Sequence, residues 1–203
     1  MRNKIVIALC SNGTQAGKTT VAEYIQRTAS DTVIESFASP IKAMTETLLT
    51  HAGLSPEYVK TCFQAASKEE AIPIKALGRD GSPRRLMQTL GTEWGRCTIN
   101  PTLWVDIMEY KINAWFARGA DIVVVDDLRF LNEAEMLANF ETYFVTIEGC
   151  QGRKTHNHIS EKQSDYIEAD YMIENTEDIT LTILFEQVDD ILAEIAERQA
   201  RYR

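Results

Sequence analysis

Cysteine is scarce in this chain, and its pattern argues against a disulfide-stapled fold. The four cysteines, Cys10, Cys62, Cys97 and Cys150, lie far apart among 203 residues and form no C-x-x-C pair. Scattered cysteines of this kind are typical of reduced thiols rather than of a disulfide framework. We therefore expect a cytoplasmic protein.

Long apolar runs and an excess of positive charge are also missing. No apolar stretch approaches bilayer length, and the first apolar run is too short for a signal peptide, so we expect no membrane association. The 30 acidic residues outnumber the 21 basic ones, which gives a formal net charge of −9. This balance argues against nonspecific nucleic-acid binding, although a local basic cleft could still bind a small anion.

The remaining composition is that of a globular protein. Apolar residues make up 44% of the chain and charged residues 25%. A chain of 203 residues can bury a substantial core, and it fits one domain with excursions better than two independent domains. The sequence contains no internal repeat or low-complexity tract.

Residues near the N-terminus follow the order of a phosphate-binding loop. Residues 5–9 form a nearly continuous apolar run, typical of a parallel strand covered on both faces. After a turn, Lys18 supplies a charge that can reach the outer phosphates, and Thr19 supplies a hydroxyl for magnesium. The following helix points its positive end at the same anion. The residues predicted to bind a nucleotide here are Asn12, Gly13, Thr14, Gln15, Ala16, Gly17, Lys18, Thr19 and Thr20.

One position departs from the pattern G-x-x-x-x-G-K-[ST]. Asn12 replaces the first glycine, and Gly13 follows one place later. Asn tolerates left-handed backbone angles better than most residues, so we expect the turn to survive the change. The alternative is an ordinary strand, turn and helix with a surface lysine. The Gly-Lys-Thr-Thr run at the junction of strand and helix favours the phosphate loop.

A second polar group follows Ser82 and Pro83, which predict the start of a helix. Arg85, Gln88 and Thr92 have i, i+3, i+7 spacing and are expected to share a face. Together with a nearby carboxylate and an indole, they could hold a planar base and a phosphate. The alternative is an amphipathic helix with its apolar side in the core. The candidate binding residues are Arg85, Gln88, Thr92, Glu93, Trp94 and Arg96.

An earlier helix is predicted from Pro40 to His51, with Ser39 as its cap. Lys42 lies beside its start, where a solvated surface charge and a contact to a substrate phosphate are equally supported. The predicted apolar face consists of Ile41, Met44, Leu48 and Leu49. Residues 55–82 are mixed and predict a short helix followed by a polar, mobile excursion.

A third group lies at the end of a predicted core strand. Residues 122–125 are β-formers followed by two carboxylates, the pattern of a buried parallel strand that delivers acids to its carboxyl edge. Asp127 could hold magnesium through water or orient an acceptor, and Arg129 could neutralise charge on a transferring group. The alternative is that Asp127 only caps the following helix.

Further elements are expected along the chain. Strands are predicted at 32–37, 143–147 and 171–173, and an amphipathic helix with Leu184 and Val188 on its apolar face closes the chain. Residues 149–161 form a polar, locally basic segment that could close over a nucleotide and bring Arg153 and Lys154 to its phosphates. A helix from Pro101 to Ala117 carries a stripe of Trp104, Met108, Ile112 and Trp115. That stripe is either core or a subunit contact in a homodimer.

In their order and number these motifs resemble the bacteriophage deoxynucleoside monophosphate kinases. The resemblance spans nearly the whole chain. Besides the phosphate loop, the stretches that carry it are residues 37–42 (Phe-Ala-Ser-Pro-Ile-Lys), residues 90–96 (Leu-Gly-Thr-Glu-Trp-Gly-Arg), Asn100-Pro101 with Leu103-Trp104, residues 127–134 (Asp-Leu-Arg-Phe-Leu-Asn-Glu-Ala), and residues 158–161 (His-Ile-Ser-Glu).

The resemblance implies an α/β P-loop kinase fold in three layers, with a parallel five-stranded sheet between helices. It implies one domain over residues 1–203, with a core of 1–37, 101–149 and 163–203, a substrate-binding excursion of 38–100 and a lid of 150–162. The implied activity is transfer of the ATP γ-phosphoryl group to a deoxynucleoside 5′-monophosphate with Mg²⁺. The implied location is the host cytoplasm if a phage encodes the chain.

The resemblance also implies roles for the candidate residues. Lys18, the loop amides and a magnesium ion on Thr19 and Asp127 would hold ATP. The arginines would neutralise the acceptor phosphate and the transition state, with Arg153 arriving on the lid. The implied catalytic residues are Lys18, Asp127, Arg129 and Arg153, and Phe37 and Lys42 join the substrate-binding residues together with Arg85, Arg96 and Arg129.

Three departures from the family pattern stand out. Thr19 replaces a common Asp, Asn12 replaces a loop Gly, and Ser39 replaces an Asp that also caps helices. Two other functions remain open. One is a P-loop kinase for another small acceptor, such as a coenzyme precursor. The other is a nucleotide-binding protein without catalysis, which would bind ATP or GTP but release no ADP.

Overall fold

The computed structural model describes residues 4–11, 16–64, 67, 70–72, 77–78, 81–149 and 166–201. The chain forms two compact units. The first consists of residues 1–37 and 107–203 and the second of residues 38–106. Within the described part, no helix is both long and apolar enough to cross a bilayer.

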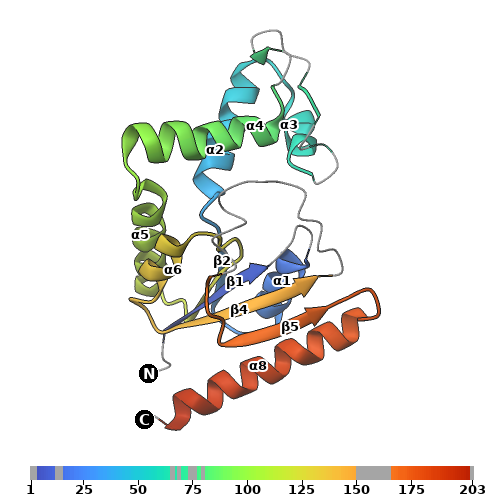
Figure 1. The fold of residues 1–203 in the computed structure, drawn as a ribbon, viewed down its shortest axis with the longest axis vertical. Helices are drawn as coiled ribbons and strands as arrows, with labels where there is room; N and C mark the ends of the chain where they lie inside the picture. Colours follow the sequence, from blue (N-terminus) through green and yellow to red (C-terminus); the bar gives the residue numbers. More distant parts are fainter. Residues whose placement is uncertain are drawn as a thin grey trace. The chain divides into compact units, whose positions relative to one another are not determined.

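The first unit is built on a five-stranded, fully parallel sheet in the order β2-β3-β1-β4-β5 (Figure 1). Its central strand pairs on both sides, with Ile7 opposite Val124 and opposite Tyr143. The predicted parallel five-stranded α/β fold is therefore confirmed. The strands are β1 (Ile5–Ser11), β2 (Thr32–Glu35), β3 (Ile122–Val125), β4 (Thr142–Gly149) and β5 (Tyr171–Asn175).

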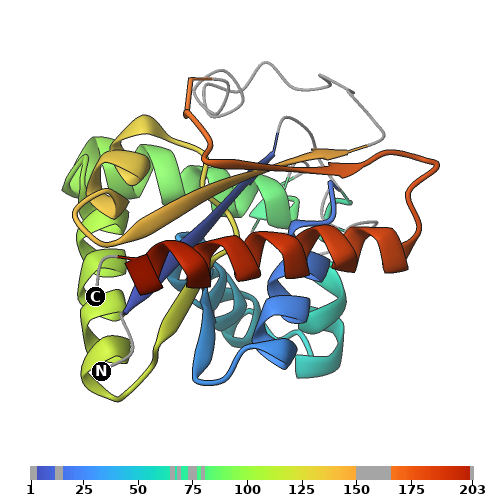
Figure 2. The ribbon, with the colours of Figure 1, turned by 90° about the horizontal axis from the view of Figure 1, so that it is seen from below.

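Helices cover both faces of this sheet, which explains the continuous apolar run of β1. Residues 5–10 are all buried, including the alternate residues Val6 and Ala8, which point away from the main core cluster. On one face, α1 (Lys18–Thr28) and α8 (Leu181–Arg201) pack on the strands. Figure 2 shows α8 running along this face. Leu184, Val188 and Ile195 bury its apolar side, as the sequence predicts.

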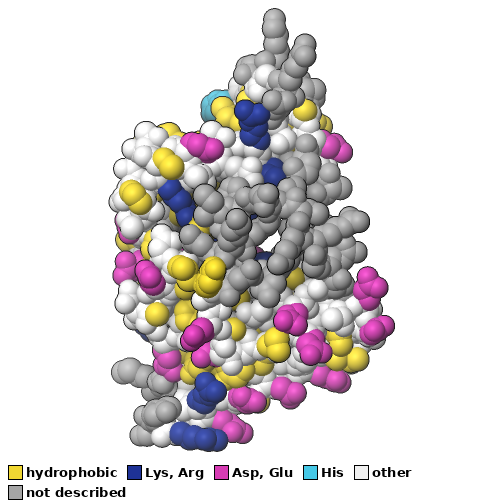
Figure 3. Space-filling model, in the orientation of Figure 1, with side chains coloured by type: hydrophobic (Ala, Val, Ile, Leu, Met, Phe, Trp, Pro, Cys, Tyr) yellow, Lys and Arg dark blue, Asp and Glu magenta, His cyan; other side chains and the backbone are white. Residues whose placement is uncertain are grey.

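The outward side of α8 is acidic. Exposed carboxylates follow this helix, and Figure 3 shows a row of acidic side chains over it. Negative charges spread over an exposed helix repel the phosphates of nucleic acids. This face of the first unit is therefore unsuited to binding nucleic acid.

The second unit is helical. Its elements are α2 (Ser39–His51), α3 (Pro56–Cys62), α4 (Pro83–Gln88), a π-helix (Thr89–Ile99) and the first turn of α5 (Leu103–Ala117). A small core of Leu49, Val59, Cys62 and Ile72 joins α2 and α3. The predicted start of α4 is confirmed, because Ser82 Oγ accepts a hydrogen bond of 3.3 Å from the Arg85 amide.

The prediction for α2 is wrong in two respects. Ser39 is already the first helical residue and Ala38 occupies the cap, so Ser39 does not cap this helix. The buried face is Ile41, Thr45 and Leu49, whereas Met44 and Leu48 are exposed. Thr45 suits a buried position because its hydroxyl donates to the Ile41 carbonyl at 2.8 Å.

Other helix boundaries also differ from expectation. The helix α5 begins at Leu103, because Asn100 Oδ1 accepts from the Thr102 amide at 3.1 Å and forms a turn before it. The short helix α6 (Leu131–Leu137) was not predicted as an element of its own. The stripe on α5 is core: Trp104, Met108 and Ile112 are buried within the chain.

A buried ion pair fixes the edge strand β2 to α5. Glu35, the last residue of β2, is 9% exposed, and its carboxylate accepts from Lys111 Nζ and, at 2.7 Å, from Trp115 Nε1. A buried carboxylate is tolerated only with such donors. The remaining residue of the predicted stripe, Trp115, therefore acts partly as a hydrogen-bond donor.

We predict that Glu35→Ala lowers the free energy of unfolding by about 2 kcal/mol, because it removes the acceptor of two partly buried donors. Urea unfolding followed by circular dichroism measures this change. Glu197→Ala is the matched control, since Glu197 pairs with Arg201 on the exposed side of α8. It should cost no more than about 0.5 kcal/mol. Equal losses in the two variants would contradict the structural role of Glu35.

Candidate active site

The strand β1 and the helix α1 frame the predicted phosphate loop. The strand ends at Ser11 and the helix begins at Lys18. Gly17 lies between them with φ 93°, a left-handed conformation that favours glycine. Asn12, Gly13, Thr14 and Gln15, predicted to bind a nucleotide, lie outside the described residues.

Lys18 lies in a cluster of charges at the carboxyl edge of the sheet. Its Nζ donates a hydrogen bond to Ser11 Oγ. Burial lowers its pKa and so does the Arg129 cation, whereas Asp127, Cys10 and Asp126 act in the opposite direction. The structure thus brings together three predicted catalytic residues, Lys18, Asp127 and Arg129. Thr19 is exposed at the same helix start and Thr20 is half-buried.

The loop backbone is also held from the other side of the sheet, which the sequence did not reveal. Asn175, the last residue of β5, donates from Nδ2 to the carbonyl of Ala16 at 3.0 Å. A Cβ on Gly17 would lie 2.6 Å from that same amide nitrogen. At the end of β4, a Cβ on Gly149 would lie 2.8 Å from the Ala16 Cα. Ala16 and Gly17, the described end of the loop, therefore pack directly on the ends of β4 and β5.

The two residues that follow β2 donate hydrogen bonds to the carboxylate of Asp127. Its Oδ2 accepts from Ser36 Oγ and its Oδ1 from the Phe37 amide, both at 2.8 Å. The alternative that Asp127 caps the following helix is wrong, because α6 begins at Leu131 with Phe130 in the cap position. Asp127 instead joins the end of β3 to the end of β2. The Phe37 ring itself is buried, and the residue contributes its backbone amide here.

Asp126 is the residue that sequence reasoning passed over. Its Oδ1 is buried and has no hydrogen-bond partner among the described residues. Burial, followed by the neighbouring Asp127 charge, raises its pKa to about 6, although Lys18 and Arg129 lower it. The strand pattern gave a signal for it, since Asp126 is the first residue after the apolar run of β3.

Arg129 is positioned through its backbone. Glu133 on α6 is 2% exposed, and its Oε2 accepts from the amides of Arg129 and Phe130 at 3.0 and 3.1 Å. The Arg129 side chain is exposed. A carboxylate at this position of a helix satisfies amides of the preceding turn, so it fixes the segment from which Arg129 extends.

The residues present fit a magnesium ion. An unpartnered buried carboxylate oxygen on Asp126 and an exposed Thr19 hydroxyl are the hard oxygen donors that Mg²⁺ prefers. Among the described residues, no group of three or more His, Cys, Asp or Glu side chains could hold a metal alone. Magnesium in phosphoryl-transfer sites needs no such cage, because substrate phosphates and water complete its coordination.

The predicted acceptor residues lie in the second unit. Arg85, Gln88 and Glu93 are exposed, Trp94 is 39% exposed, and Thr92 and Arg96 are half-buried. Lys42 lies over the Phe63 ring, 5.4 Å from its centroid, and 3.9 Å from Glu46. Arg153, Lys154 and the predicted lid lie outside the described residues.

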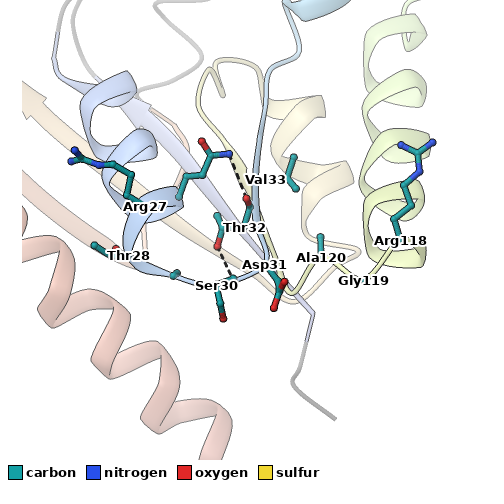
Figure 4. Close-up of a pocket in the computed structure, with 11 residues that line it drawn as sticks. Arg27, Thr28, Ser30, Asp31, Thr32, Val33, Arg118, Gly119 and Ala120 are labelled. Atoms are coloured by element: carbon teal, nitrogen blue, oxygen red, sulfur yellow. Dashed lines mark hydrogen bonds between the residues drawn. The ribbon is translucent and has the colours of Figure 1, made fainter.

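A hollow of about 500 Å³ occurs at the opposite, amino edge of the sheet. It is lined by residues 26–33 and 118–120, and Figure 4 shows Arg27 and Arg118 pointing away from each other. The dashed bonds there join Gln26 to Thr32 and Thr32 to Ser30. Ligands of open α/β sheets bind at the carboxyl edge, so this hollow is not the candidate site.

A parallel sheet with a Gly-Lys-Thr helix start after β1 and acids after the adjacent β3 defines a P-loop phosphate-binding protein. The model of the deoxynucleotide monophosphate kinase family matches residues 50–188, and the chain belongs to that family. The predicted family and the predicted class of enzyme, a nucleotide kinase, are thereby confirmed. Membership implies a nucleotide phosphoryl donor and a deoxynucleotide monophosphate acceptor.

Individual relatives are more distant. A segment of 56 residues is 39% identical to the deoxynucleoside-5′-monophosphate kinase of Escherichia phage T5 and covers 28% of this chain but only 21% of that protein. A "Putative deoxynucleotide monophosphate kinase" of Acanthamoeba polyphaga mimivirus is 28% identical over 155 residues, 71% of this chain and 75% of that protein. A superposition on the crystal structure of a sugar kinase from Janibacter sp. HTCC2649 spans 94% of this chain and 95% of that chain, with 15% sequence identity and a TM-score of 0.46.

We predict that Asp126→Asn stabilises the metal-free protein at neutral pH. Because the folded-state pKa is raised to about 6, wild-type stability from this group is complete below its unfolded pKa and is lost as pH rises through 6. The advantage of the variant should therefore grow by about 2 kcal/mol between pH 4 and pH 7. Urea unfolding in EDTA measures it. The exposed Asp178→Asn should show no such trend, and a pH-independent difference for Asp126→Asn would contradict the prediction.

Proposed function

We propose that this protein transfers the γ-phosphoryl group of ATP to a deoxynucleoside 5′-monophosphate. The observation that carries the proposal is the convergence of Lys18, Asp126, Asp127 and Arg129 at the carboxyl ends of β1 and β3, in a chain of this family. Phosphoryl transfer needs little covalent chemistry from the protein. It needs two anions held in line and charge neutralised as it develops.

The donor side uses the loop and its surroundings. Lys18 would exchange its hydrogen bond to Ser11 for phosphate oxygens of ATP, together with backbone amides at the start of α1. Arg129, held by Glu133, would neutralise charge on the transferring group. Thr19 and Asp126 would hold magnesium, with Asp127 fixing the adjoining backbone. When bound, the metal neutralises charge on the phosphate oxygens.

The acceptor side uses the second unit. Arg85 and Arg96 provide planar forks that suit the acceptor phosphate. Gln88 and Glu93 can read the edge of a base, and Trp94 offers a partly exposed ring for stacking. Lys42 supplies a further cation near the start of α2. Thr92 can add a hydroxyl contact, Phe37 adjoins the site through its backbone, and Arg153 and Lys154 would reach the phosphates from the lid.

The same proposal places the reaction in the cytoplasm, where ATP and deoxynucleotides meet. Cys10, Cys62 and Cys97 are free thiols, which agrees with such a setting. A homodimer stays a prediction, and the aromatic stripe that suggested it is largely buried within the chain.

An ADP-release assay across common and modified deoxynucleoside monophosphates tests the reaction. We expect turnover with at least one of them, and loss of the whole signal when EDTA removes magnesium. Turnover only with other small acceptors would favour a coenzyme-precursor kinase. ATP binding without ADP release would indicate a nucleotide-binding protein without catalysis.

Lys18→Ala should lower the turnover number by about 100-fold or more, because the transferring phosphates lose their buried cation. The fold should persist, as circular dichroism can verify. Arg201→Ala, which removes an exposed cation at the end of α8, serves as the control and should keep wild-type turnover. A Lys18→Ala protein that works at the normal rate would overturn the assignment of the donor site.

A further inference from the structure

The acceptor residues are carried by an unusual helix. At Thr89 the α-helix α4 continues as a π-helix that runs for 11 residues to Ile99. The wider turn shows in two i to i−5 contacts: Thr98 Oγ1 donates to the Glu93 carbonyl at 2.8 Å, and the Asn100 amide donates to the Gly95 carbonyl at 3.0 Å. Most π-helices are single turns, and they are frequent at functional sites. This one requires a specific cause.

Trp104 is placed to provide that cause. It lies on the first turn of α5, its side chain is 3% exposed, and its Nε1 donates to the Gly91 carbonyl at 2.7 Å. Four residues further along the π-helix, a Cβ on Gly95 would lie 2.5 to 2.7 Å from three atoms of the same indole ring. The indole therefore lies against the helix backbone at Gly95 and bonds to it at Gly91. Both contacts lie within the second unit.

These two contacts couple the register of the helix to the indole. A buried indole N–H that lost its acceptor would cost stability, so the carbonyl of Gly91 must stay where Trp104 can reach it. In an i to i−5 helix, residues four or five apart lie on one face. The indole thus meets the carbonyl of Gly91 and the bare Cα of Gly95, about one turn apart, while Glu93 and Trp94 are exposed and Arg96 is half-buried. A return to α-helical geometry would rotate these side chains relative to the indole.

We infer that Trp104 is a positioning residue for acceptor recognition. Its hydrogen bond to Gly91 and its packing on Gly95 hold residues 89–99 in the π form, and that form directs Glu93 and Arg96 toward a deoxynucleoside monophosphate. The inference rests on the proposed function for its ligand. The lock itself rests only on contacts between Trp104 and the two glycines.

Two glycine variants form a matched pair that tests the lock. Gly91→Ala and Gly95→Ala make the same substitution in the same helix, so they change helix propensity equally. The added methyl of Gly91→Ala meets only the end of the flexible Ile41 side chain, at 3.0 Å, whereas that of Gly95→Ala meets the rigid indole. Calorimetric titration with the acceptor that the wild-type protein phosphorylates fastest should show at least tenfold weaker binding for Gly95→Ala. Gly91→Ala should stay within threefold of wild type.

Trp104→Phe tests the hydrogen bond separately, because phenylalanine keeps an aromatic ring but has no donor. We expect a higher KM for the acceptor, with the KM for ATP within twofold of wild type. A merely structural role would lower the unfolding midpoint and leave the ratio of the two KM values unchanged. A crystal structure of this variant should show i to i−4 bonds replacing i to i−5 bonds within residues 89–99.

The outcomes separate this inference from the proposed function. If wild-type protein neither binds nor phosphorylates any deoxynucleoside monophosphate, the proposed function fails and the acceptor role of Trp104 fails with it. If the wild-type protein is active but Gly95→Ala and Trp104→Phe bind the acceptor normally, only the inference is overturned. Equal weakening in Gly91→Ala and Gly95→Ala would show that helix propensity, not the indole, controls the register. A Trp104→Phe crystal structure that retains the π-helix would overturn the lock directly.

Discussion

The burial of Lys18 next to another cation is the constraint on which the first unit depends. Burial and Arg129 both disfavour its charged form, and the nearby carboxylates of Asp127 and Asp126 oppose them. Burial and the neighbouring Asp127 in turn raise the pKa of Asp126. The charged form of each group is thus destabilised by burial and by a like charge, and it is stabilised by the neighbouring opposite charges. A polyphosphate entering this cluster would relieve the repulsion between Lys18 and Arg129, and a divalent cation would do the same for the carboxylates.

Such a cluster needs a rigid frame, and the frame is made of hydrogen bonds from distant parts of the chain. Glu133 fixes the backbone of Arg129, Asn175 fixes the carbonyl of Ala16, and Asp127 fixes the end of β2. Glu35 then ties β2 to α5 through Lys111. Supporting groups of this kind hold reacting residues in place without touching substrate. These bonds involve the ends of β2, β3 and β5, and the bare backbone of Gly149 at the end of β4 packs on Ala16.

Local signals explain what could be predicted from the sequence. The apolar run before Lys18, the run before Asp126 and the Ser82 cap depend on residues close together in the chain, so the fold and the position of Lys18 at the start of a helix followed from them. Separating the roles of Asp126 and Asp127 required the pairing of β2 with β3, which brings Ser36 and Phe37 to Asp127. The sequence shows both acids but does not show which residues contact them. The face expected for Arg85, Gln88 and Thr92 assumed α-helical spacing throughout, and the π-helix begins between Gln88 and Thr92.

In the proposed mechanism the two substrate sides are organised by different physics. Donor residues are fixed by buried charges whose balance depends on one another, so a substitution there changes pKa values and stability along with chemistry. The proposed acceptor residues on the π-helix would instead be placed by backbone register, which in our inference Trp104 sets from outside the helix without adding charge. Under this inference, a substitution at an exposed side chain such as Glu93 would change base choice while the Trp104 contacts stay intact. A change in the helix register would alter base choice without replacing any residue that meets the base.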